Sequence, residues 1–152
     1  MTKIDIISGF LGAGKTTFVK LLLRFYDVDR GVYRLSTVTE KSSQLSNSMA
    51  LLIGLGNKGL AEKMINDESL IKVTLSMNTF YYDALLSVDK YRYSDFIVED
   101  IKKKYGKMLD EGATTFWEPE KGWRDFDNAG SLCHGWSAIP AYYLPRLIKH
   151  NY

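Results

Sequence analysis

The stretch MNTFYYDALLSV, residues 77–88, decides the fold class of this chain. Its apolar side chains recur at intervals of three and four residues, which places them on one face of an α-helix. These residues are Met77, Phe80, Tyr81, Ala84, Leu85 and Val88. No other segment has so clear a helical stripe, so the sequence predicts an amphipathic helix here.

The segment before this stretch follows the same helical period. A helix is expected with Ser42 or Ser43 as its N-cap and Gly54 or Gly56 at its end, because Ser favours N-caps and Gly favours helix ends. Its inward residues are Leu45, Met49, Leu52 and Ile53. A short helix is expected over residues 60–65. Further upstream, residues 27–40 form a polar connection with a weakly extended piece around Val32.

The segment after the stretch predicts two more helices. One begins near Ser94, and its inward residues are Ile97, Ile101, Tyr105 and Met108. The last covers residues 131–148 and is kinked or interrupted at Pro140 and Pro145. Residues 110–135 have the composition of an irregular, aromatic-rich loop, and all three tryptophans lie between 117 and 136. Helices joined by short loops predict a mainly α fold of about three stacked helical hairpins.

Composition narrows the classes of function. A chain of 152 residues fits one domain, and a net charge of +2 indicates neither nucleic acid nor an anionic membrane as partner. The single cysteine, Cys133, favours a reducing compartment and is expected to be a small buried core residue. Charges and glycines interrupt the apolar N-terminus, which argues against a membrane helix and a signal peptide. A cytoplasmic location is therefore expected.

A phosphate-binding motif stands near the N-terminus. Residues 9–16 read GFLGAGKT, a complete match to GxxxxGK[ST] that begins at Gly9. A short apolar strand over residues 4–7 precedes it, and a helical pattern from 15 to about Tyr26 follows it. In such a loop, backbone N–H groups surround phosphate oxygens, Lys15 reaches the β and γ phosphates, and Thr16 is a ligand of Mg²⁺.

Residues 1–23, MTKIDIISGFLGAGKTTFVKLLL, resemble the start of CobW-type GTPases. The resemblance implies Mg²⁺ with GTP, or ATP, bound through Gly12, Gly14, Lys15, Thr16 and Thr17. The rest of that family's apparatus is missing. The best candidate for an acidic Mg²⁺-binding strand, residues 96–100, falls inside the helical stripe that begins near Ser94, so a helix is favoured there.

The irregular loop carries residues suited to carbohydrate. Glu118 follows an aromatic residue, and glycoside hydrolysis needs a pair of carboxyl groups. Aromatic rings stack on sugar faces, and polar side chains bind hydroxyls. The candidates for these contacts are Trp117, Trp123, Trp136, Asp125, Asp127 and His134. Asp125 and Asp127 equally suit a turn, and His134 a helix cap or the core.

Residues 24–152 resemble bacterial α-L-rhamnosidases and related six-hairpin glycosidases, most specifically in GATTFWEPEKGWRDFDNAGSLCHGWSAIPAYYL, residues 112–144. The resemblance implies the C-terminal part of an (α/α)6 toroid. It matches Glu118 to the general base of an inverting mechanism and His134 to a substrate contact. In that family the general acid comes from an earlier part of the barrel, which the phosphate-loop segment replaces here.

The sequence thus favours residues 1–23 as an incomplete nucleotide-binding segment and 24–152 as part of a glycosidase domain, with a rhamnoside-type ligand and little turnover alone. The alternatives are a truncated CobW-type nucleotide-binding protein and a non-catalytic carbohydrate-binding module. An open toroid would leave the stripe of residues 77–88 without neighbours, so self-association through exposed apolar helix faces is expected.

Overall fold

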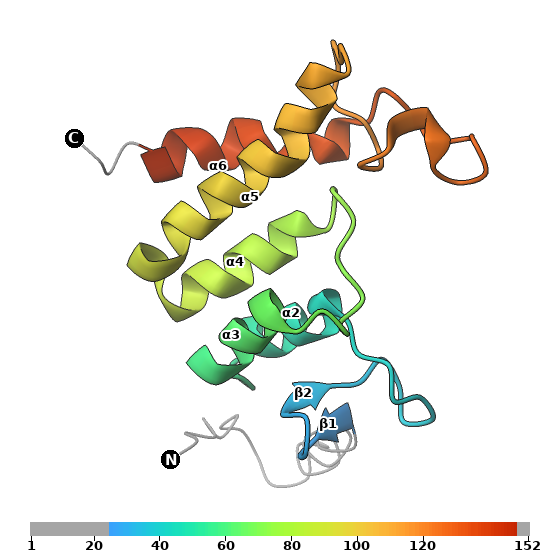
Figure 1. The fold of residues 1–152 in the computed structure, drawn as a ribbon. Helices are drawn as coiled ribbons and strands as arrows, with labels where there is room; N and C mark the ends of the chain where they lie inside the picture. Colours follow the sequence, from blue (N-terminus) through green and yellow to red (C-terminus); the bar gives the residue numbers. More distant parts are fainter. Residues whose placement is uncertain (1–24, 149–152) are drawn as a thin grey trace, which may run out of the picture. The chain divides into compact units, whose positions relative to one another are not determined.

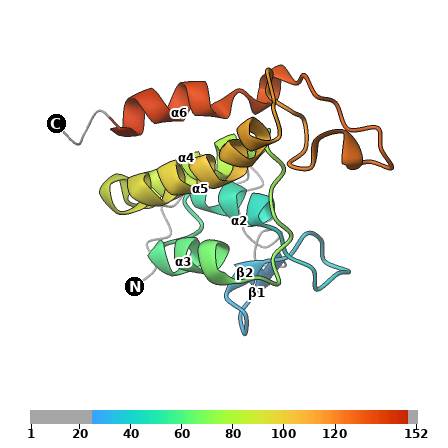
Figure 2. The ribbon, with the colours of Figure 1, turned by 45° about the horizontal axis from the view of Figure 1, so that its top comes forward.

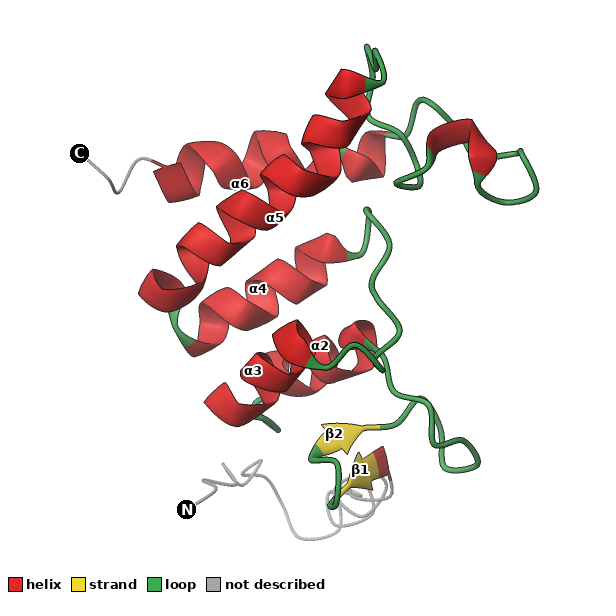
Figure 3. Cartoon of the chain, in the orientation of Figure 1, coloured by secondary structure: helices red, strands yellow, loops and turns green. Residues whose placement is uncertain are grey.

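The computed structural model describes residues 25–148, which form two compact units. The first unit ends at Lys72 and the second begins at Val73. Helices are the main secondary structure of these residues, and the mainly α fold class is confirmed (Figure 3). The phosphate loop and the strand expected before it lie outside the described residues.

The first unit contains a small hairpin and two helices. Strand β1 (Tyr26–Asp27) pairs antiparallel with β2 (Val32–Tyr33), in a register that sets Tyr26 opposite Tyr33. The helix expected from residue 15 to about Tyr26 lies outside the described residues except at its end, where Phe25 is helical and Tyr26 begins β1. The extended piece around Val32 is confirmed.

Helices α2 (Gln44–Leu52) and α3 (Lys58–Asn66) form a hairpin in this unit. Ser43 caps α2 through a reciprocal pair of hydrogen bonds with Ser46, which confirms one of the two predicted N-caps. The chain leaves α2 through Gly54, whose φ of 80° suits glycine. Asn57 caps α3 and accepts hydrogen bonds from two backbone N–H groups.

The second unit contains α4 (Asn78–Val88), α5 (Lys90–Asp110) and α6 (Ile139–Leu147). Helices α4 and α5 lie side by side, and α6 packs on α5 (Figures 1 and 2). Helix α5 begins four residues before Ser94, because the side chain of Asp89 accepts a hydrogen bond from the Arg92 N–H and caps it. The described residues thus contain two helical hairpins, α2–α3 and α4–α5, and one further helix, α6, where about three hairpins were expected.

Two expectations about proline and apolar exposure are corrected. Pro140 occupies the first turn of α6, where a missing N–H costs nothing, so it begins a helix and does not kink one. The stripe of residues 77–88 is not open, because Tyr81, Ala84 and Leu85 are buried. The centre of this helix therefore has no exposed apolar face of the kind expected to cause self-association.

Residues 96–100 lie within α5, as the helical period favoured. Within residues 25–148 no helix combines the length and the apolar character that a membrane crossing requires.

Candidate carbohydrate-contact site

The loop between α5 and α6 is held together by hydrogen bonds between residues 115–118 and residues 131–134. The backbone N–H of His134 donates to the Phe116 carbonyl (2.7 Å), and the N–H of Glu118 donates to the Ser131 carbonyl (2.9 Å). The hydroxyl of Thr115 donates to the Leu132 carbonyl between them. Glu118 is two residues, at most about 7 Å of extended chain, from Phe116, whose carbonyl accepts the His134 hydrogen bond.

The carboxylate of Glu118 is half-buried and held weakly. Its Oε2 accepts a hydrogen bond from the Ser131 N–H at 3.4 Å, near the limit for such a bond. Within the described part of the chain no cation forms an ion pair with it. Such a carboxylate keeps free lone pairs with which to bind a hydroxyl or a water molecule.

The three tryptophans have different surroundings. Trp117 is 6% exposed, and its ring lies against Gly122, so it forms the wall behind the loop. Trp136 is 75% exposed, and its ring meets the His134 ring edge to face at 6.0 Å. Trp123 is 51% exposed and carries the Arg124 guanidinium over its ring. Trp136 and Trp123 therefore present ring faces to solvent, whereas Trp117 does not.

Asp125 and Asp127 shape the tip of the loop. Asp125 forms an ion pair with Lys121 (3.7 Å), and its backbone carbonyl accepts from the Ala129 and Gly130 N–H groups. Asp127 has a φ of 56° and stands in a left-handed run of residues 126–128. Both therefore serve as turn residues, which the sequence had left open.

An ion pair ties this tip to α5. Arg124 donates to Glu111 at 2.6 Å, and this hydrogen bond lowers the pKa of the Glu111 carboxyl. The carboxyl is thus kept ionised and does not suit the role of a general acid.

Beside Trp136 lies a hollow of about 470 Å³ that the sequence did not indicate. Aromatic rings of Phe80, Trp136 and Tyr142 line it, together with the hydroxyl-bearing residues Ser76 and Thr79. The Arg146 guanidinium stacks 3.4 Å from the centre of the Tyr142 ring and holds it in place. Apolar ring faces beside hydroxyls suit a sugar. In the sequence, the residues that could have indicated this hollow are those of the first turn of the stretch 77–88, which line it together with the start of α6.

Two polar clusters fix α4 against its neighbours. The Tyr82 hydroxyl and the Lys104 ammonium both donate to Asp100, at 2.7 and 2.8 Å, and Lys104 also donates to the buried Asn78. Burial, and then the Asp100 charge, raises the pKa of Tyr82.

Next to this cluster, the Tyr143 hydroxyl donates to Asp83 (2.7 Å) and lies 3.0 Å from the Thr79 carbonyl. Burial is also the main cause that raises the pKa of Tyr81, Tyr105 and Tyr143.

Cys133 is exposed, so the expectation of a buried core residue was wrong. It lies on the outer segment 131–134, whose backbone pairing leaves it at the rim. The described residues contain no group of three or more side chains able to hold a metal ion. The proposed nucleotide and Mg²⁺ contacts, from Gly9 to Thr17, lie outside the described residues.

The comparisons with solved structures point to one class of enzyme. A rhamnosidase from Klebsiella oxytoca with rhamnose bound matches 84% of this chain with a TM-score of 0.67 and 24% identity. A GH78 family rhamnosidase from Bacillus sp. GL1 matches 80% with a TM-score of 0.64 and 25% identity. The described residues share their fold with part of these rhamnosidases. The match spans only 26% and 14% of the two rhamnosidase chains. No family model and no curated protein matches this chain.

Proposed function

We propose that this chain forms a rhamnoside-binding face of an α-L-rhamnosidase-type glycosidase domain. The observation that carries the proposal is the hydrogen bonding of residues 115–118 to residues 131–134, the segments that contain Glu118 and His134, with the exposed Trp136 ring against the His134 ring. The likeness to rhamnosidases supports the same sugar class. In this proposal the Trp136 ring stacks on the sugar. His134 and the hydroxyl-bearing residues of the hollow beside Trp136 form hydrogen bonds with the sugar hydroxyls.

Glu118 would act as the base that activates a water molecule for inverting hydrolysis. A base alone is insufficient, since the departing oxygen must be protonated by a second carboxyl group on the other side of the sugar. Glu111, which an ion pair ties to the tip of the loop, is engaged by Arg124. The expected function is therefore sugar binding with little or no turnover by the chain alone.

The test is a titration of the full chain with L-rhamnose, followed by tryptophan fluorescence, with D-glucose as the control sugar. Trp136→Ala should weaken rhamnose binding about fivefold, since an aromatic contact contributes roughly 1 kcal/mol beyond its buried area. Trp123→Ala is the matched control, because this tryptophan is also exposed but belongs to the tip. Equal losses in both variants, or equal binding of glucose, would contradict the proposal.

The complete phosphate-loop motif supports a second candidate function, nucleotide binding at Gly12, Gly14, Lys15, Thr16 and Thr17. Binding is expected to be weak and without base selectivity, since the phosphates alone would be held. Calorimetry with Mg-GTP and Mg-ATP tests this, with Lys15→Ala as the control. Micromolar, GTP-selective binding that the variant loses would make the CobW-type reading the better one.

A further inference from the structure

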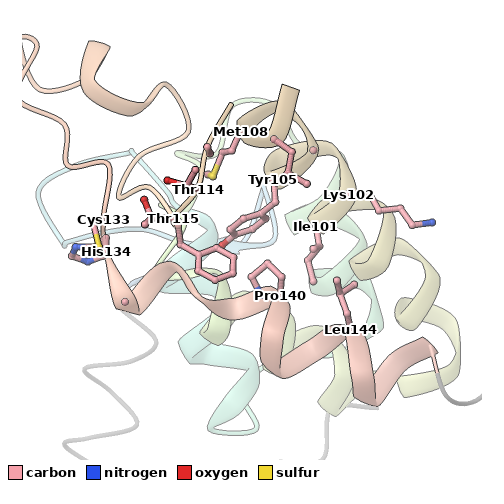
Figure 4. A pocket seen from close by; sticks show the side chains of 15 residues that line it. Ile101, Lys102, Tyr105, Met108, Thr114, Thr115, Cys133, His134, Pro140 and Leu144 are labelled. Carbon is pink, nitrogen blue, oxygen red and sulfur yellow. The ribbon is translucent and has the colours of Figure 1, made fainter. Parts of the chain in front are cut away.

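Helix α6 presents different groups to its two neighbouring helices. Pro140 and Leu144 line a mostly apolar cavity of about 820 Å³ together with residues of α5, and Gly106 lies in its wall (Figure 4). Tyr143 precedes Leu144 in the sequence but reaches α4, where its hydroxyl lies 3.0 Å from the Thr79 carbonyl. The cavity over Gly106 is thus an apolar contact of α6, whereas the Tyr143 hydroxyl makes a polar one.

The Tyr143 hydroxyl has one proton and three oxygen atoms within reach. Oδ1 of Asp83 lies at 2.7 Å, the Thr79 carbonyl at 3.0 Å and the Thr79 hydroxyl at 3.3 Å. Burial raises the pKa of Tyr143, so the phenol keeps its proton at neutral pH. The proton goes to the Asp83 carboxylate, because this contact is the shortest and a charged acceptor forms the stronger hydrogen bond.

The contact between the two hydroxyls therefore has a fixed direction. A carboxylate and a carbonyl can only accept, so neither of them leaves the Tyr143 proton available for Thr79. Thr79 is the donor in this contact, which is long for a hydrogen bond between hydroxyls, and the Tyr143 oxygen accepts. Oγ1 of Thr79 then keeps lone pairs but has no proton to give to another partner.

Thr79 also lines the hollow beside Trp136. Among the described residues that line this hollow, none is charged, and Ser76 is the other one with an aliphatic hydroxyl. Such walls suit a neutral ligand that carries hydroxyl groups. Since the Thr79 proton is engaged by Tyr143, Thr79 is suited to a ligand group that donates a hydrogen bond.

We infer that Asp83 and Tyr143 are positioning residues that make Thr79 a hydrogen-bond acceptor for one free hydroxyl of the sugar. The inference rests on the proposed function of the hollow as part of a rhamnoside site. It makes the hollow selective for a sugar with a free hydroxyl where the ring meets Thr79. A methoxy group or a fluorine atom at that position has no proton to donate, and such a sugar binds more weakly.

The experiment titrates the full chain with methyl α-L-rhamnoside and with its analogues in which fluorine replaces the hydroxyl at C2, C3 or C4. The analogue altered at the Thr79 contact should bind roughly two- to tenfold more weakly than the parent glycoside, because one hydrogen bond is lost. This difference should vanish in Thr79→Val, which is close to threonine in size but has no hydroxyl.

Asp83→Asn tests the positioning role. The asparagine amide can donate to the Tyr143 oxygen, which lets Tyr143 donate to Thr79 and frees the Thr79 proton for the hollow. The preference for hydroxyl over fluorine at that position should therefore fall towards unity. Asp110→Asn is the matched control, because this aspartate is also exposed and helical but lies at the end of α5. A purely structural role of Asp83 would weaken the parent glycoside and the analogue alike and leave their ratio unchanged.

Three results would overturn the inference while the proposed function stands. They are equal binding of the parent and all three analogues by the unaltered chain, a fluorine penalty that persists in Thr79→Val, and an unchanged ratio in Asp83→Asn. The first of these needs no variant to fold. A chain that does not bind methyl α-L-rhamnoside at all would contradict the proposed function itself, and the inference with it.

Discussion

Gly122 is a residue on which the geometry of the candidate site depends. It has a φ of 59°, and a Cβ atom there would lie 2.7 Å from Cε3 of Trp117 and 3.1 Å from Leu132. Gly122→Ala should therefore lower the free energy of unfolding by about 1 kcal/mol, because alanine is strained in the left-handed backbone conformation. The overpacking of the new methyl group against the buried Trp117 ring should lower this free energy by roughly a further 1–3 kcal/mol. We expect a loss of about 2–4 kcal/mol in the free energy of unfolding.

Two other glycines separate these contributions. Gly112 has a φ of 81° with open space around it, so Gly112→Ala should cost only the backbone part, about 1 kcal/mol. Gly106 is helical with open space, so Gly106→Ala should stabilise by up to about 1 kcal/mol. Urea unfolding followed by tryptophan fluorescence measures all three. A loss at Gly122 no larger than at Gly112 would refute the packing of Trp117 against this turn.

Three further outcomes are expected. Asp100→Asn should cost about 2–3 kcal/mol in urea unfolding, because Lys104 and Tyr82 lose a charged partner that is only 18% exposed, and adding Lys104→Met should recover part of it. Stability should fall as pH rises above about 10, since the unfolded chain releases tyrosine protons that the fold retains, which the urea midpoint at increasing pH checks. The tyrosines concerned are Tyr81, Tyr82, Tyr105 and Tyr143. No hydrolysis of an aryl α-L-rhamnoside is expected from the chain alone, and hydrolysis that Glu118→Gln abolishes would contradict this.

Local sequence signals determined most helices of the described residues, although the last was expected from residue 131 and begins only at Ile139. The stripe of residues 77–88, the cap at Ser43 and the end at Gly54 depend on contacts within a few residues, so they can be read without the fold. The same holds for the helical assignment of residues 96–100. The resemblance around Glu118 also led to the rhamnosidase fold that the structural comparisons support.

Only the tertiary structure decided which of the candidate side chains face solvent. The sequence gives no reason to distinguish Trp117, Trp123 and Trp136. In the structure Trp117 is buried where it packs against Gly122, whereas the other two are exposed. The hollow beside Trp136 and the cavity over Gly106 join helices α4, α5 and α6 with the loop, across more than sixty residues of chain. Such sites arise from contacts between distant segments, which hydrophobic periodicity does not report. Even the buried face of a helix is decided by packing, since in α2 the residues Met49, Leu52 and Ile53 were expected to face inward but are exposed, whereas Ala50 and Leu51 are buried.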